Sequence, residues 1–84
     1  MMITIDCTGV ETPQQMHALL ASRLEFPSYY GHNLDALFDC LTQIRRQITI
    51  ELEGWMGLGE WKERFANVFV NVGLENPNLD IILK

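Results

Sequence analysis

The chain has 84 residues, of which 48% are hydrophobic and 20% are charged, and its formal net charge is −5. This length suits one small domain with a modest core and excludes a second domain. The acidic balance makes nucleic acid a poor direct partner and favours a basic protein instead. No apolar run approaches the roughly 20 residues of a membrane span, and no secretion signal precedes the first strand, so we expect a cytoplasmic protein without membrane contacts.

The first half of the chain predicts a strand, a helix and a loop. Ile3 and Ile5 alternate with polar residues up to Cys7, which is typical of a strand. The run Thr12-Pro13-Gln14-Gln15 predicts a helix start, with a capping box and proline at the first helical position. This helix should run to about Leu24, and Pro27 then places the residues that follow it in a loop.

The second half predicts two helices and two strands. A helix should run from Asn33 to about Gln43, and alternation over 48–53 indicates a strand. Glycines at 54, 57 and 59 then mark a loop. The final helix shows one apolar face and should end before Asn76-Pro77; that face consists of Trp61, Phe65, Val68, Phe69 and Val72. A last strand covers 79–83, so we predict an α/β fold, a small three-stranded parallel sheet packed with helices, in a single domain over residues 1–84.

The segment from Pro27 to Thr42 carries the candidate site. Asn33 can cap the second helix, and Asp35 lies in its first turn, where the helix dipole favours an anion. Asp35 and Asp39 stand at i, i+4 on one polar face, although like charges at this spacing slightly destabilise an isolated helix. The opposite stripe is apolar. The acidic face is therefore either an ordinary solvated surface or a surface kept for a partner, and these residues alone leave both explanations open.

This segment closely resembles the signature of the barstar family of intracellular ribonuclease inhibitors. The signature reads proline, any residue, two tyrosines, glycine, any residue, Asn-Leu-Asp-Ala-Leu, an aromatic residue, then Asp-Cys-Leu-Thr, and residues 27–42 match it throughout. A looser likeness covers the rest of the chain. The resemblance implies a barstar-like fold and a one-to-one inhibitor, monomeric when free, of a basic extracellular ribonuclease of the barnase type. It implies no enzymatic activity, no cofactor and no metal.

The resemblance also implies which residues contact the partner. Six positions match the family's binding segment: Tyr29, Gly31, Asn33, Asp35, Asp39 and Thr42. We add Phe38, which keeps an aromatic contact, and Glu75, which keeps an acidic residue, to the predicted partner-binding residues. Their carboxylates would occupy the positions of RNA phosphates in a cationic active site, with Asp39 as the deepest contact.

The sequence departs from the family pattern beside these positions. Phe38 stands where the best-known member has tryptophan, and Gln43-Ile44 replaces a Gly-Trp pair. Asn71 stands where the family carries a binding glutamate, although Glu75 keeps an acidic residue nearby. These departures suggest a partner that differs in detail or binds less tightly.

Other aromatic and titratable residues have simpler explanations. Two consecutive tyrosines in a loop usually cannot both be buried, so at least one of Tyr29 and Tyr30 should face solvent or a partner. Trp55 is expected over the sheet and Trp61 in the helix stripe. We interpret His17 as structural or surface and His32 as a surface residue at the edge of the site. No metal spacing connects these histidines to the two cysteines, Cys7 and Cys40, which fit small buried hydrophobes in a reducing compartment.

Three hypotheses for the function are consistent with the sequence. The first is ribonuclease inhibition, and the second is a barstar-like module for another basic protein, a toxin or a regulator, which the departures favour. The third is a small hydrolase that uses Asp35, Asp39 and His32. The hydrolase is the weakest, because 84 residues leave little room for a closed pocket and an acid–base pair needs environments that separate its two pKa values.

Overall fold

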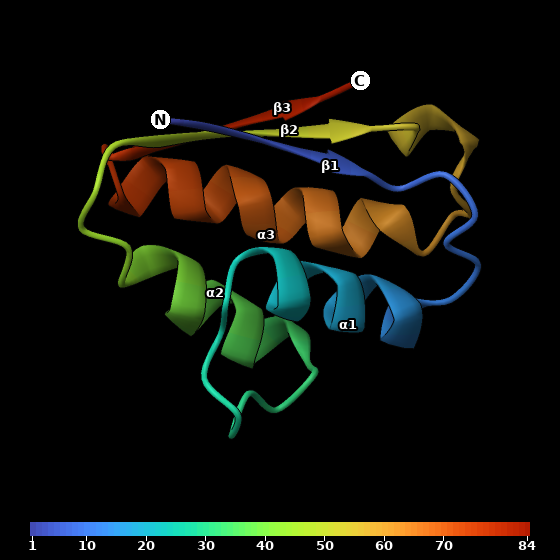
Figure 1. The fold of residues 1–84 in the computed structure, drawn as a ribbon, viewed down its shortest axis with the longest axis horizontal. Coiled ribbons are helices and arrows are strands. Elements are labelled where there is room, and N and C mark those ends of the chain that lie inside the picture. The colour runs from blue at the N-terminus through green and yellow to red at the C-terminus, as the bar shows by residue number, and fades with distance from the viewer.

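Three parallel strands form one sheet in the order β1-β2-β3, and the helices cover one face of it (Figure 1). The computed structural model describes every residue from Met1 to Lys84. The strands are β1 (Met2–Asp6), β2 (Ile48–Glu53) and β3 (Leu79–Leu83). The helices are α1 (Pro13–Arg23), α2 (Leu34–Thr42), the short 3₁₀ helix η1 (Trp55–Gly57) and α3 (Lys62–Glu75). The predicted α/β fold with a three-stranded parallel sheet is confirmed.

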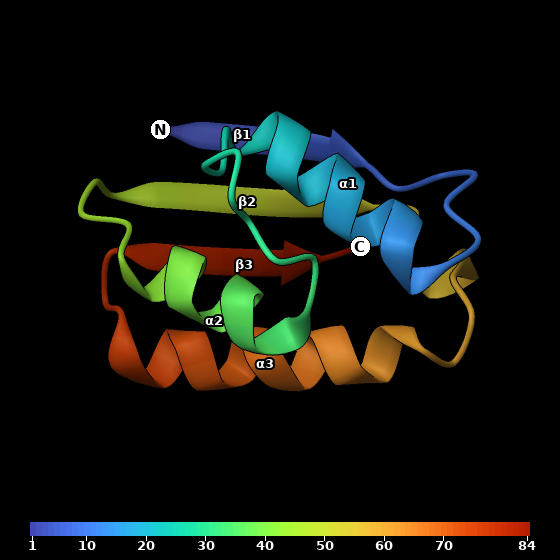
Figure 2. The same cartoon turned by 90° about the horizontal axis from the view of Figure 1, so that it is seen from below.

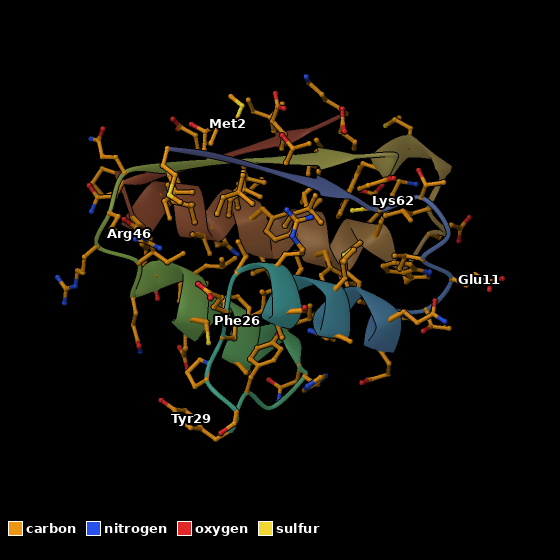
Figure 3. All side chains as sticks on the ribbon, in the orientation of Figure 1. Met2, Glu11, Phe26, Tyr29, Arg46 and Lys62 are labelled. Carbon is orange, nitrogen blue, oxygen red and sulfur yellow. The ribbon has the colours of Figure 1, made fainter.

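The alternation along each strand decides which face of the sheet is covered. Ile50 in the central strand pairs with Ile3 of β1 and with Ile81 of β3, and these side chains point toward the helices. The intervening residues, among them Met2 and Glu51, lie on the outer face, which no helix covers (Figure 3). Because side chains alternate between faces, one sheet can bury an apolar layer and expose a mixed one.

Both predicted helix caps are present, with one correction. The Thr12 hydroxyl accepts from the Gln15 backbone N–H at 3.1 Å, as a capping threonine should. The Gln15 side chain, however, accepts from the backbone N–H of Glu11 at 2.6 Å and not from that of Thr12. The reciprocal bond of a capping box is therefore displaced by one residue toward the amino terminus.

The core lies between the sheet and the helices. Fully buried side chains from every layer meet there, including Ile5, Met16, Leu37, Leu52 and Phe65. Trp55 of η1 is 3% exposed and belongs to the core, where its ring lies beside that of Phe69 of α3, with 5.7 Å between centroids. Trp61 is half-buried with its ring edge toward Phe65, as expected for the apolar stripe of α3.

Helix α2 packs along α3 (Figure 2). Its inner residues Leu37 and Leu41 are 0% and 1% exposed, whereas Asp35 and Asp39 on the other side are exposed. Helix α2 lies in the layer of helices below the sheet (Figure 1), and its polar face is exposed. None of the helices is long and apolar enough to cross a membrane.

Candidate protein-binding site

Asn33 positions both the helix and the loop of the candidate site. Its Oδ1 accepts from the Ala36 backbone N–H at 2.8 Å, which confirms the predicted cap of α2. Its Nδ2 donates to the carbonyl oxygen of Gly31 at 3.2 Å. A Cβ at position 31 would lie 3.0 Å from this Nδ2, so a larger residue there would press on the amide. One side chain therefore starts the helix and fixes the backbone that precedes it.

The carboxylates of Asp35 and Asp39 are exposed and form no ion pair. The ion pair of the structure joins Lys84 to Glu51 at 3.0 Å, on the outer face of the sheet. Glu51 therefore has a lowered pKa, because the Lys84 ammonium stabilises its charged form. Asp35 and Asp39 have no ion-pair partner within the chain, so both remain open to cations of a partner.

The two tyrosines of the loop have opposite environments. Tyr29 is 86% exposed and lies at the outermost point of the loop (Figure 3). Tyr30 is 6% exposed, and its hydroxyl oxygen lies 2.7 Å from Nδ1 of His17. The prediction that at least one tyrosine faces solvent is confirmed, and it is Tyr29.

His17 is a structural residue and not a surface one. Its ring is buried, 3% exposed, between Tyr30 and Phe65. Burial lowers the pKa of His17, and the imidazole of His32, whose centroid is 6.3 Å away, lowers it further. Burial also raises the pKa of Tyr30, so the bond joins a neutral imidazole to a protonated hydroxyl. His32 itself is exposed, in agreement with its predicted place at the edge of the site.

Helix α2 separates two hollows in the surface. The first, which we call the tyrosine groove, has a volume of about 790 Å³ and includes Tyr29, Gly31 and Asp39 in its lining. The second has a volume of about 870 Å³ and includes Asp35 and Asn33, together with both histidines. The structure therefore brings these predicted site residues to one side of the molecule, but it directs the two carboxylates toward different hollows.

Phe38, Thr42 and Glu75 line neither hollow. Phe38 and Thr42 are half-buried on α2, and the Thr42 hydroxyl donates to the Phe38 carbonyl oxygen at 2.9 Å. In the free protein that hydroxyl donates its hydrogen within its own helix, and its oxygen can still accept a hydrogen bond from a partner. Glu75 is exposed at the last residue of α3. Asn71 is also exposed on α3.

Asn76 has a role that the sequence did not reveal. We expected it only as part of the helix stop, yet it is 4% exposed and its Nδ2 donates to the carbonyl oxygens of Leu41 at 2.9 Å and Ile44 at 3.0 Å. These carbonyls lie at the end of α2, where helices leave acceptors without intrahelical partners, and that of Leu41 also accepts from the Ile44 backbone N–H at 3.4 Å. Asn76 therefore joins the ends of α2 and α3, and the neighbouring Glu75 comes to the same end of the molecule. A lone asparagine before proline gives no local signal for such a contact.

The two cysteines are free thiols. Cys7 is fully buried, and Cys40 is half-buried in the lining of the tyrosine groove. Burial raises the pKa of Cys40, and the adjacent Asp39 raises it further, so the thiol is a poor nucleophile. No three His, Cys, Asp or Glu side chains are arranged to hold a metal ion.

The fold and the site define a small α/β protein that exposes two unpaired carboxylates on one helix. The family model described as "Barstar (barnase inhibitor)" matches residues 1–72. The chain belongs to the barstar family, and the resemblance found in residues 27–42 is confirmed. A Bacillus subtilis (strain 168) protein named "Putative ribonuclease inhibitor YrdF" is 52% identical to it over 40 residues. That match covers 48% of this chain and 44% of the relative, so it spans less than half the length of either.

Proposed function

We propose that this protein is a cytoplasmic inhibitor, monomeric when free, that binds a basic ribonuclease of the barnase type one-to-one. The observation that carries the proposal is that Asp35 and Asp39 are exposed one helical turn apart and have no ion pair within the chain. A ribonuclease holds RNA phosphates with arginine, lysine and histidine side chains. Two carboxylates at this spacing can take the phosphate positions and form charge-assisted hydrogen bonds there.

The residues around the carboxylates support a protein partner. The exposed ring of Tyr29 offers a large apolar contact with a hydroxyl at its end, which is typical of interface anchors. Asn33 holds Gly31 in place before any partner arrives, which reduces the ordering needed on binding. We assign Asp39 the central contact and Asp35 a place beside it. Membership of the barstar family and the name of the Bacillus subtilis relative support the same class of function.

Binding fits this surface better than catalysis does. A hydrolase would need Asp35, Asp39 and His32 to converge on one substrate. Asp35 and His32 line one hollow, whereas Asp39 lines the other. Neither carboxylate forms an ion pair with His32. We therefore propose an inhibitor and not an enzyme.

The test is a titration of purified barnase-type ribonucleases with this protein, in which RNA cleavage is measured after each addition. We expect activity to disappear at one equivalent for a ribonuclease that the protein recognises. Asp39→Ala should weaken inhibition at least about thirtyfold, because truncating a central, desolvated charge costs more than about 2 kcal/mol of binding free energy. Asp80→Ala is the matched control, since it removes an equally exposed carboxylate from β3.

Two results would count against the proposal. Equal inhibition by Asp39→Ala and the wild type at limiting concentration would remove the proposed mechanism. If a large excess of this protein inhibited none of the ribonucleases tested, the acidic face would have to bind a different basic partner. Gln43 and Ile44, which line the tyrosine groove beside Asp39, favour that second candidate. A basic protein without ribonuclease activity that binds the wild type and Asp80→Ala but not Asp39→Ala would establish it.

A further inference from the structure

The tyrosine groove extends beyond the residues that the proposed function uses. Seventeen residues line it, and ten of these are hydrophobic. One part of the lining belongs to the proposed site and includes Tyr29, Gly31 and Asp39. Other parts come from the edge strand β1, from the end of α1 and from the connection between α2 and β2. The groove is therefore continuous with the acidic face, so a partner that covers Asp39 also approaches the groove.

Two arginines bring unpaired positive charge to this groove, whose lining also contains the carboxylates of Glu25 and Asp39. Arg46, on the connection between α2 and β2 (Figure 3), is exposed and takes part in no ion pair. Arg23, the last residue of α1, donates from Nη2 to the Thr4 carbonyl oxygen at 3.0 Å, a bond that holds the guanidinium without neutralising it. Glu25 also lines the groove but pairs with neither arginine.

A partner that covered these guanidinium groups with apolar or basic surface would desolvate them without supplying hydrogen-bond acceptors or an opposite charge. Burying an unpaired cation is costly, and placing like charges opposite one another costs several kcal/mol. We therefore expect an anion on the partner surface that faces the two guanidinium groups. That surface should also be apolar, because hydrophobic side chains form most of the lining, among them Ile3, Phe26 and Ile44.

We propose that the tyrosine groove receives an apolar loop of the partner ribonuclease, and that a carboxylate on this loop pairs with Arg46 and Arg23. This inference rests on the proposed function and specifies its partner. The interface then has two halves of opposite charge: Asp35 and Asp39 meet the cationic active site, and the arginines meet an acidic loop beside it. Such a pattern fixes the register of the complex and rejects basic proteins that lack the acidic loop.

The experiment compares Arg46→Glu with Arg45→Glu. Both positions are exposed and adjacent, but only Arg46 lines the groove. Both variants make the protein more acidic by the same amount, so general attraction to a basic partner strengthens binding equally in the two. The proposal instead predicts that Arg46→Glu inhibits at least tenfold more weakly than Arg45→Glu. The assay is RNA cleavage by the barnase-type ribonuclease that the wild type inhibits best.

The outcomes separate this inference from the proposed function. Equal inhibition by the two variants, or stronger inhibition by Arg46→Glu, would overturn the acidic-loop proposal while inhibition by the wild type still stood. Unchanged inhibition together with altered self-association of Arg46→Glu in sedimentation velocity would assign the groove to a second copy of the chain and also overturn the proposal. Lack of inhibition by the wild type would overturn the proposed function itself. Circular dichroism would verify that both variants keep the native fold.

Discussion

The Tyr30 hydroxyl lies 2.7 Å from Nδ1 of His17, so the loop that carries Tyr29 is fastened to α1 inside the protein. Tyr29 can be almost fully exposed because its neighbour Tyr30 supplies the anchor. The same bond connects the protonation of a buried imidazole to the position of the proposed binding loop.

Stability should therefore depend on pH through His17. Folding lowers the pKa of His17 below its ordinary value of 6.5, because burial and the nearby His32 disfavour the charged ring. Between the two pKa values the unfolded chain binds more protons, so the contribution of the neutral ring is complete above pH 6.5 and is lost as the pH falls from there toward the folded pKa. Urea denaturation at a series of pH values should show this decline.

His17→Gln should be less stable near neutral pH but should show a shallower decline over the same range. His32→Gln is the matched control, since it keeps the buried imidazole and should retain most of the decline. A slope for His17→Gln identical to that of the wild type would assign the pH dependence to other groups.

Asn76→Ala should destabilise the protein by about 2 kcal/mol, because it removes the side-chain donor from the carbonyl oxygens of Leu41 and Ile44, of which only that of Leu41 keeps a backbone donor, the Ile44 N–H at 3.4 Å. Asn71→Ala removes an exposed amide from the same helix and should change the free energy of unfolding by less than about 0.5 kcal/mol. Urea denaturation of both variants measures the difference. Equal stabilities would mean that water replaces the Asn76 amide.

Substitutions at Asn33 should separate the helix cap from the loop contact. Asn33→Ala loses both, and should lower the free energy of unfolding by about 1 kcal/mol. Asn33→Asp keeps an acceptor for the Ala36 N–H but has no donor for the Gly31 carbonyl oxygen, so it should keep most of the stability. Ribonuclease inhibition should be weaker in both variants if Gly31 must be held in place. Inhibition by Asn33→Asp at the wild-type level would show that the loop contact is dispensable.

Gly54→Ala should destabilise the turn after β2 by more than about 1 kcal/mol. Gly54 has φ of 77°, and a Cβ there would lie 2.9 Å from the Thr8 hydroxyl oxygen and 3.2 Å from the Thr8 backbone nitrogen. Gly57→Ala provides the comparison, because a Cβ at that position meets nothing within 4 Å. Thermal unfolding should show a clear loss for the first variant and little change for the second. Similar midpoints would indicate that the turn relaxes around the new methyl group.

Local patterns in the sequence predicted most of the fold. Strand alternation around Ile3 and Ile50, the caps Thr12 and Asn33, and the break at Pro27 each act within a few residues, and each appears where expected. The hydrogen bond of the Gln15 side chain shows the limit of such rules. This flexible side chain can accept from the backbone N–H of Thr12 or from that of Glu11, and local sequence does not determine which.

The candidate site was predictable only in part. The i, i+4 spacing placed Asp35 and Asp39 on one helical face, but it could not show that they border different hollows, since the hollows also depend on α1, α3 and β1. The choice between Tyr29 and Tyr30 as the exposed ring depends on His17, which is 13 residues from Tyr30. Asn76 contacts residues 35 and 32 positions earlier, a separation at which periodicity carries no information.

The bond from Asn76 to the end of α2 also has a consequence for the order in which the surface is completed during translation. The ribosome delivers residues 29–42 well before residue 76, and small domains generally fold as units. Until α3 and Asn76 emerge, the end of α2 lacks the donor that Asn76 supplies, and the central strand lacks β3 on one side. A nascent chain interrupted between Thr42 and Asn76 would contain most of the proposed contact residues without the scaffold that orients them, so the proposed binding surface should form only after Asn76 has been synthesised.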